Sequence, residues 1–211
     1  EAERVALLLG VPTMLVALLE AQTVQPRDVS CVRAMGSGGA MVPAELVRRI
    51  WKAFGCAFYI VYGQTESSCL LSIAAPDDCE TVGQPLAQTE VSIRDPQTNT
   101  VQRPGVVGEI CVRAYGVMLG YNDDPKATSK AIDTDGWLRT GDLGTLDARG
   151  RLRITGRVKE MIIRGGENLF PAEIENVLLE HPDVAEAAVV GIPDERWGEV
   201  VVAFLRPAMG A

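Results

Sequence analysis

The chain has 211 residues, a formal net charge of −8 at pH 7 and 47% hydrophobic residues. This is enough to bury a core and to form one large domain, or one domain and part of a second. No block of Lys and Arg offsets the negative charge, so we expect neither nucleic acid nor an anionic membrane surface as a partner. The longest apolar runs are far too short for a transmembrane segment.

Five cysteines are scattered along the chain, and none of them forms a Cys-x-x-Cys pair. An odd number of unclustered cysteines is typical of reduced, mostly buried thiols rather than of a disulfide framework. Because the start also lacks a signal-peptide pattern, we predict a cytoplasmic protein. The first residue is Glu1, and both ends interrupt apolar patterns, so we expect an internal piece of a longer protein.

The first third of the chain alternates helix and strand patterns. Residues 12–21 and 43–54 predict helices that each begin at a proline, and Gly55 is a stop signal for the second. Residues 36–40 read Gly-Ser-Gly-Gly-Ala and predict a flexible loop between the helices. Residues 57–62 predict a buried strand that ends at a glycine. Such alternation favours an α/β fold class.

The middle of the chain changes to short strand patterns. Residues 90–94 and 108–113 alternate polar and apolar side chains around a turn that contains Pro and Gly. Residues 143–146 and 151–155 flank an Asp-Ala-Arg-Gly turn, which predicts a hairpin. We interpret these four segments as a small antiparallel sheet or barrel.

The last part of the chain returns to an α/β pattern. Residues 171–180 predict an amphipathic helix with Ile174, Val177 and Leu178 on its apolar face. Residues 184–192 and 199–205 then predict two strands.

A change of pattern near Val158 and Lys159 predicts a domain boundary. Residues 1–158 would be the end of a large domain, and residues 159–211 the first half of a smaller α+β domain.

Common nucleotide and metal motifs are absent. No Gly-Lys dipeptide is present for a Walker loop, and Gly36-x-Gly38 lacks the third glycine of a dinucleotide fingerprint. His181 is the only histidine, so any histidine-based catalytic or metal site would need this residue. Its position before a proline favours a simpler role at a helix end.

A first segment with chemistry suited to a nucleotide follows the predicted buried strand. Tyr62, Thr65 and Glu66 supply a ring that can stack on a base, a hydroxyl for a phosphate and a carboxylate for Mg²⁺. Strand ends that break into glycine loops commonly present side chains to a crevice. The alternative is that Thr65 and Glu66 cap a following helix.

Two further segments have similar properties. In residues 136–142, Asp142 lies between predicted strands beside a glycine, where a carboxylate could accept both hydroxyls of a ribose; the alternative is a turn aspartate. Residues 156–168 bracket the predicted boundary with charges and contain a Gly-Gly pair that permits close approach of a ligand. The alternative there is an ordinary linker followed by a strand and a turn.

In this order and spacing, the three segments resemble the adenylate-forming superfamily of acyl-CoA synthetases, peptide-synthetase adenylation domains and firefly luciferases. The resemblance covers nearly the whole chain, from residue 10 to residue 199. Residues 161–168, followed by Pro-x-Glu-Ile-Glu at residues 171–175, are similar to the acyl- and aryl-CoA synthetase branch. Residues 108–113 and 117–121 are similar to the fatty-acyl branch.

The resemblance implies an AMP-forming acid–thiol ligase of fatty acid metabolism. In this family a carboxylate attacks the α-phosphate of ATP to give acyl-AMP and pyrophosphate, and coenzyme A then displaces AMP to give the thioester. ATP, Mg²⁺ and coenzyme A are therefore the implied cofactors, and a carboxylic acid is the implied substrate. The alternatives are an aryl- or dicarboxylate-CoA ligase and a non-catalytic nucleotide-binding remnant.

The resemblance also implies roles for single residues. Tyr62 would stack on the adenine, Thr65 would bind the α-phosphate, and Glu66 would hold the magnesium ion. Asp142 would accept the ribose hydroxyls, and Arg157 would contact ribose or phosphate.

Several loop residues complete the implied site. The residues expected to line the adenine and acyl-carboxylate pocket or to bind the cofactor are Gly38, Gly39, Ala40 and Gly63. Lys159 falls on the hinge between the two domains, and Gly166 would border the pantetheine tunnel. The family's phosphate-binding loop and its adenylation lysine would lie outside the chain, so we expect the isolated chain to be inactive.

Overall fold

The structure is a computed structural model that describes residues 3–208 of the chain. Within it, the chain divides into two compact units. Unit 1 comprises residues up to 92 together with 111–140 and 146–153, and unit 2 comprises residues 93–110, 141–145 and those from 154 onward. The domain boundary near Val158 and Lys159 stays a prediction.

Unit 1 contains a five-stranded sheet in the order β1-β2-β3-β4-β5. The first three strands, β1 (Leu7–Leu9), β2 (Ala34–Ser37) and β3 (Ala57–Tyr62), are parallel. The short strands β4 (Ser72–Ile73) and β5 (Gln84–Pro85) continue the sheet in antiparallel pairing. Parallel neighbours need a crossover between them, and a helix supplies each one here.

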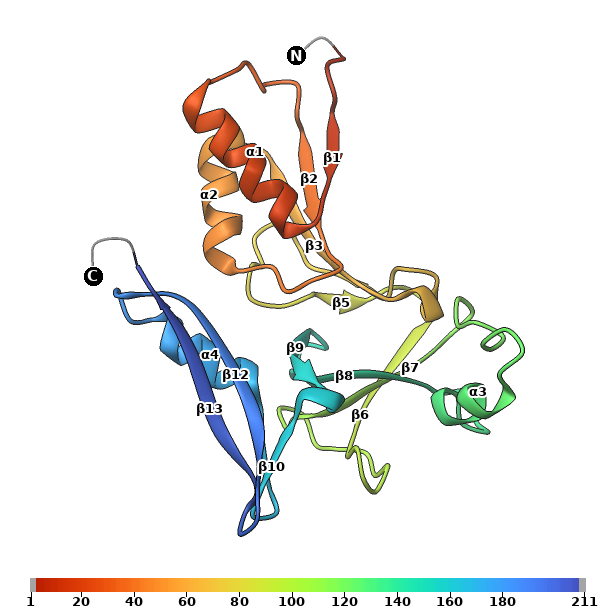
Figure 1. Ribbon diagram of the computed structural model, residues 1–211. Coiled ribbons are helices and arrows are strands. Elements are labelled where there is room, and N and C mark those ends of the chain that lie inside the picture. The colour runs from red at the N-terminus through yellow and green to blue at the C-terminus, as the bar shows by residue number, and fades with distance from the viewer. Residues whose placement is uncertain (1–2, 209–211) are drawn as a thin grey trace. The chain divides into compact units, whose positions relative to one another are not determined.

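Those crossovers are α1 (Pro12–Val24) and α2 (Ala44–Phe54), which lie next to each other beside β1–β3 (Figure 1). Both predicted helices are confirmed, and α1 is longer than predicted. Proline occupies the first turn of α1, and Gly55 ends α2 in the left-handed conformation with φ of 61°. The core between helices and sheet is formed by Leu15, Leu19, Val32, Met35, Leu46, Val47, Ile50, Cys56, Phe58, Ile60 and Ala74.

The prediction of a loop over residues 36–40 is partly wrong, because Gly36 and Ser37 belong to β2. Gly36 pairs with Leu9 on one side and Tyr59 on the other. A Cβ at this glycine would lie 2.8 Å from Cδ2 of Leu9. The glycine therefore serves close packing inside the sheet, and the loop begins only at Gly38.

A second sheet has the strand order β6-β7-β8-β9. Its strands are β6 (Thr89–Arg94), β7 (Gly108–Ala114), β8 (Leu138–Leu146) and β9 (Leu152–Arg157). All four predicted strands are present, but β7 is buried at five successive residues instead of alternating. Because β8 begins at Leu138, Asp142 lies inside a strand, and the prediction that it lies between strands is wrong.

A short helix, α3 (Pro125–Ala131), was not predicted. Its start has a local signal, since Asp124 accepts a hydrogen bond from Ala127 N at 2.8 Å and a proline follows it.

The later part of unit 2 contains an antiparallel sheet with the order β11-β10-β13-β12. In chain order, this part contains the 3₁₀ turn η2 (Val158–Glu160), β10 (Ile162–Arg164), β11 (Glu167–Leu169), α4 (Pro171–Leu179), β12 (Val184–Asp194) and β13 (Gly198–Pro207). Figure 1 shows α4 lying along β12. The helix and both strands predicted here are confirmed.

The apolar face predicted for α4 is wrong at one residue. Ile174 is half-buried, whereas Val177 is 66% exposed. Leu178, four positions after Ile174, is half-buried as well, so the covered row runs through these two residues and Val177 lies at its edge. Between residues 3 and 208, no helix has the length and apolar character needed to cross a membrane.

Candidate functional site

Two glycine loops lie at the carboxyl ends of adjacent parallel strands in unit 1. The loop that starts at Gly38 follows β2, and the loop that starts at Gly63 follows β3. A Cβ on Gly38 would lie 2.5 Å from the carbonyl oxygen of Val61, and one on Gly63 would lie 2.4 Å from that of Cys69. Only glycine permits these approaches, so backbone packing holds the first loop against β3 and closes the second loop onto its own later residues.

The loop after β3 forms a single 3₁₀ turn, η1 (Thr65–Ser67). The Ser67 hydroxyl donates to the carbonyl oxygen of Gln64 at 3.0 Å and accepts from its N–H at 3.3 Å. Ser67 therefore closes the turn, and no α-helix follows it directly. Thr65 and Glu66 thus do not act as caps of a following helix. In the part of the chain that the structure describes, the Thr65 hydroxyl makes no hydrogen bond, and this residue is exposed.

Glu66 lies half-buried in this turn and contacts a segment far along the chain. Its Oε1 accepts a hydrogen bond from the Tyr121 hydroxyl at 3.0 Å, and its carbonyl oxygen accepts from Met118 N at 2.8 Å. The hydrogen bond to Glu66 raises the pKa of Tyr121 above its usual value, and partial burial adds to this. The contact of residues 117–121 with Glu66 was not predicted, although the same residues carry part of the family resemblance.

The arrangement fits a magnesium ion. Oε2 of Glu66 has no hydrogen-bond partner among residues 3–208, and the Thr65 hydroxyl lies next to it in sequence. Mg²⁺ is usually held by one or two carboxylates together with substrate phosphates rather than by a cage of protein ligands. Among residues 3–208, no group of three or more His, Cys, Asp or Glu side chains could by itself hold a metal ion.

Tyr62 is the last residue of β3 and is only 7% exposed. It lies on the same face of the strand as Phe58 and Ile60, as the alternating burial of β3 requires. The structure therefore places most of the ring against protein, and stacking on adenine stays a prediction for this residue.

In unit 2, the structure brings together Asp142 and Arg157. Nε of Arg157, at the end of β9, lies 3.3 Å from Oδ1 of Asp142 in β8. The aspartate side chain is 15% exposed, and the arginine side chain is 54% exposed. The pair thus offers a carboxylate and a guanidinium at one point, which suits a hydroxyl-rich, anionic ligand.

A buried carboxylate supports the backbone next to Asp142. Oε1 of Glu109, a residue only 4% exposed, accepts a hydrogen bond from Gly141 N at 3.2 Å. Gly141 has φ of 74°, a conformation that favours glycine. This role of Glu109 was not predicted, since no local pattern links two residues that are 32 positions apart in the sequence.

Lys159 is exposed and lies in η2, where Met161 N donates to the carbonyl oxygen of Val158 at 3.3 Å. Gly165 and Gly166 form the two-residue turn between β10 and β11, with φ of 59° and 88°. Positive φ at both residues is typical of a tight hairpin turn. A Cβ on Gly166 would meet nothing within 4 Å, so its backbone borders open space.

Two family models match separate segments of the chain. A family model for AMP-binding enzymes matches residues 1–122, and one for the AMP-binding enzyme C-terminal domain matches residues 173–211. The chain belongs to the AMP-binding enzyme family. Asp142, Arg157 and Lys159 lie between the two matched segments.

Relatives of this AMP-binding enzyme chain cover almost all of it. A protein described as a putative acyl-CoA synthetase, YngI, from Bacillus subtilis is 42% identical over 98% of the chain and 39% of its own length. An indoleacetate–CoA ligase from Aromatoleum aromaticum is 42% identical over 100% of the chain and 41% of its own length. The chain thus spans about two fifths of the length of these relatives.

Solved structures of the family share its fold. The amide bond synthetase McbA from Marinactinospora thermotolerans matches with a TM-score of 0.90 and 37% identity, over 100% of this chain and 43% of that one. The o-succinylbenzoate–CoA synthetase MenE from Bacillus subtilis, in complex with ATP and a magnesium ion, matches with a TM-score of 0.82 and 36% identity. That match covers 97% of this chain and 42% of MenE.

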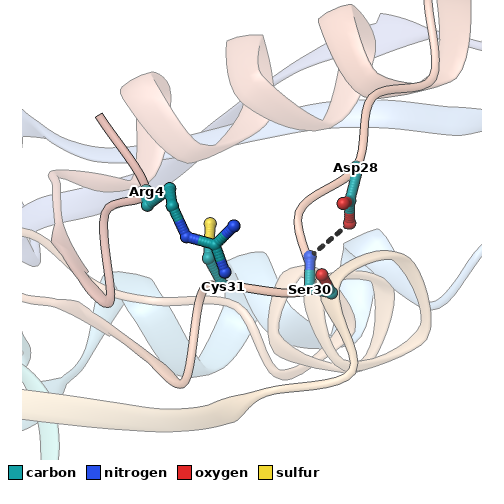
Figure 2. Close-up of a pocket in the computed structure, with 4 residues that line it drawn as sticks. All are labelled: Arg4, Asp28, Ser30 and Cys31. Carbon is teal, nitrogen blue, oxygen red and sulfur yellow. Dashed lines mark hydrogen bonds between the residues drawn. The ribbon is translucent and has the colours of Figure 1, made fainter. Parts of the chain in front are cut away.

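Two hollows in unit 1 of this AMP-binding enzyme chain contain none of the predicted site residues. One, of about 140 Å³, is lined by Arg4, Asp28, Ser30 and Cys31, with Ser30 N donating to Asp28 at 3.0 Å (Figure 2). The other, of about 280 Å³, lies around Asp78.

Partial burial by itself would raise the pKa of Asp78. Hydrogen bonds from Thr81 and from backbone N–H groups, with the nearby charge of Arg151, reverse that effect and hold the pKa below its usual value.

Proposed function

We propose that the protein carrying this chain is an ATP-dependent acyl-CoA synthetase. It activates a carboxylic acid as acyl-AMP and transfers the acyl group to coenzyme A. The observation that carries the proposal is the pair of glycine loops, starting at Gly38 and Gly63, at the carboxyl ends of adjacent parallel strands. Ligands of α/β sheets bind at this edge. The relatives, which include an acyl-CoA synthetase described as putative and a CoA ligase, support the same activity.

The loop after β3 is proposed to bind the phosphates. The exposed Thr65 hydroxyl would donate to the α-phosphate, and Oε2 of Glu66 would bind Mg²⁺. When bound, the metal ion neutralises negative charge on the phosphates. The protein's own contribution is then mainly to orient the α-phosphate for attack by the acid.

Other loop residues are proposed to hold the rest of the nucleotide. Gly38, Gly39 and Ala40 would line the pocket for adenine and the acyl carboxylate, and Tyr62 would stack on the adenine. Asp142 would accept the ribose hydroxyls, with Arg157 at 3.3 Å from its carboxylate and in contact with ribose or phosphate.

The second half-reaction is proposed to depend on residues 159–211 acting as a separate small domain that follows a large domain ending at residue 158. Lys159 would be the hinge, because it lies exposed in a one-turn 3₁₀ segment that can change its backbone angles. Gly166, which borders open space, would let pantetheine approach its backbone.

The acid is proposed to be a fatty acid, as the similarity of residues 108–113 and 117–121 indicates. Aryl and dicarboxylic acids are the competing substrates, and the name of one relative, an indoleacetate–CoA ligase, favours testing them together. McbA is named an amide bond synthetase, so an amine is the competing acyl acceptor.

We also propose a cytoplasmic protein that binds no nucleic acid. The five cysteines of the chain are all free, and two of them are buried. The net charge of −8 disfavours binding to a phosphate backbone.

The test is ATP–pyrophosphate exchange by the whole protein with a panel of fatty, aryl and dicarboxylic acids. We expect exchange with fatty acids, followed by thioester formation when coenzyme A is added. Glu66→Ala should abolish exchange, while Glu45→Ala, which removes an exposed carboxylate paired with Arg48 on α2, should not. Binding of AMP without exchange for any acid would support a non-catalytic remnant instead.

A further inference from the structure

Residues 116–121 are docked onto the turn that carries Glu66. Met118 N donates to the carbonyl oxygen of Glu66 at 2.8 Å, and the Ser68 hydroxyl donates to the carbonyl oxygen of Gly116 at 2.8 Å. The third link is the Tyr121 hydroxyl, which donates to Oε1 of Glu66 at 3.0 Å. Two links thus fix the backbones, and only the tyrosine reaches the carboxylate.

Tyr121 is itself braced from behind. Its N–H donates to the Thr128 hydroxyl at 2.9 Å, and that hydroxyl donates to the carbonyl oxygen of Asp124 at 2.8 Å. Asp124 also caps α3. A Cβ on Gly120 would lie 2.8 Å from Cγ2 of Thr128, so the chain before the tyrosine is packed tightly against this helix. The phenol is therefore presented from a held segment and not from a free loop.

The hydrogen bond gives the two oxygens of Glu66 different roles. Oε1 is occupied by the phenol, while Oε2 makes no hydrogen bond within residues 3–208. The terminal torsion of a glutamate is broad, so an unrestrained carboxylate samples many orientations. A donor on one oxygen holds the carboxylate plane and leaves the other oxygen directed away from the donor.

We propose that Tyr121 is a positioning residue that orients the Glu66 carboxylate for the magnesium ion of Mg·ATP. The proposal rests on the function proposed above, in which Glu66 binds the metal. The tyrosine touches neither the nucleotide nor the metal ion; it reduces the entropy that is lost when the carboxylate that binds the metal ion is ordered. Its removal therefore weakens metal binding and leaves the acid site unchanged.

The first experiment compares Tyr121→Phe with the unaltered whole protein. We expect the Mg²⁺ concentration for half-maximal ATP–pyrophosphate exchange to rise about three- to tenfold, as for loss of one hydrogen bond to a partly exposed charged group. The KM for the acid should not change. In electron paramagnetic resonance titrations, Mn²⁺ should bind more weakly by the same factor in the presence of α,β-methylene-ATP.

Two further variants separate positioning from general stability. Ser68→Ala removes the neighbouring link to Gly116 but keeps the phenol–carboxylate bond, so metal binding should not change. In a Glu66→Ala background, Tyr121→Phe should have no further effect on Mn²⁺ binding, because the group through which it acts is gone.

The possible failures are distinguishable. If Glu66→Ala weakens Mn²⁺ binding but Tyr121→Phe does not, the role of Tyr121 is refuted and the proposed function stands. If Tyr121→Phe weakens binding equally with and without Glu66, the tyrosine acts by another route and the proposal is overturned. If Glu66→Ala leaves Mn²⁺ binding intact, the metal role of Glu66 falls, and the Tyr121 proposal falls with it.

Discussion

Replacing Asp142 by alanine tests the proposed ribose contact most directly. The carboxylate is 15% exposed, and Oδ1 lies 3.3 Å from Nε of Arg157. A hydrogen bond from a hydroxyl to a charged acceptor contributes about 1.5–3 kcal/mol. Loss of one such bond lowers kcat/KM for ATP about 10- to 160-fold, and loss of both bonds lowers it further.

Thermal melts of the variant separate the effect on ATP use from any loss of stability, because the Asp142 side chain is only 15% exposed while that of Arg157 is 54% exposed. Glu80→Ala is the matched control, because Glu80 is an exposed carboxylate that pairs with Arg153 at 3.2 Å and has no proposed nucleotide contact.

The assay measures kcat/KM for ATP, 2′-deoxy-ATP and 3′-deoxy-ATP in pyrophosphate exchange, with several acids. The unaltered protein should lose activity with each deoxy analogue, while Asp142→Ala should treat all three nucleotides alike. The loss with ATP should be the same for every acid. If Asp142→Ala discriminates against the analogues as strongly as the unaltered protein does, Asp142 does not bind the ribose.

Three further predictions concern a glycine, the hinge and acid stability. Gly38→Ala should destabilise the protein by about 1–3 kcal/mol in thermal melts, because its Cβ would lie 2.5 Å from a carbonyl oxygen of β3. Gly10→Ala, whose Cβ would meet its nearest atom at 3.4 Å, should be nearly neutral, and equal losses would contradict this reasoning. Lys159→Pro fixes φ near −65° and so restricts rotation at the proposed hinge. In single-turnover assays, thioester formation should fall by orders of magnitude, while acyl-AMP formation should be spared. Equal slowing of both steps would count against the hinge. The pKa of Asp78 in the folded protein lies below its ordinary value of 3.8. The ionised carboxylate therefore stabilises the fold fully above pH 3.8, and this stabilisation is lost as the pH falls through the folded pKa. Asp78→Asn should flatten the acid side of a plot of melting temperature against pH, and an unchanged slope would refute this.

Local patterns were sufficient for much of the fold. The helix at residues 44–54 was predicted from its apolar stripe and from Gly55, and both features act within one or two turns of the chain. The strand at residues 57–62 followed from its composition and the glycine after it. Such signals are short-range, so they are legible without the tertiary structure. The local signal was ambiguous at Gly36, because a glycine is common both in flexible loops and at places where a strand packs closely against its neighbour. In the structure, Gly36 lies in a strand and packs closely against Leu9.

The sequence by itself determined the family, because the order and spacing of three short segments are specific even when each segment alone is not. It also indicated Glu66 and Asp142 as candidate ligands of the nucleotide. Only the tertiary structure decided what holds these carboxylates. Tyr121 meets Glu66 across 55 residues of sequence, and Arg157 meets Asp142 from another strand. Such contacts depend on strand register and on close backbone approach between distant segments, and no local pattern encodes either one.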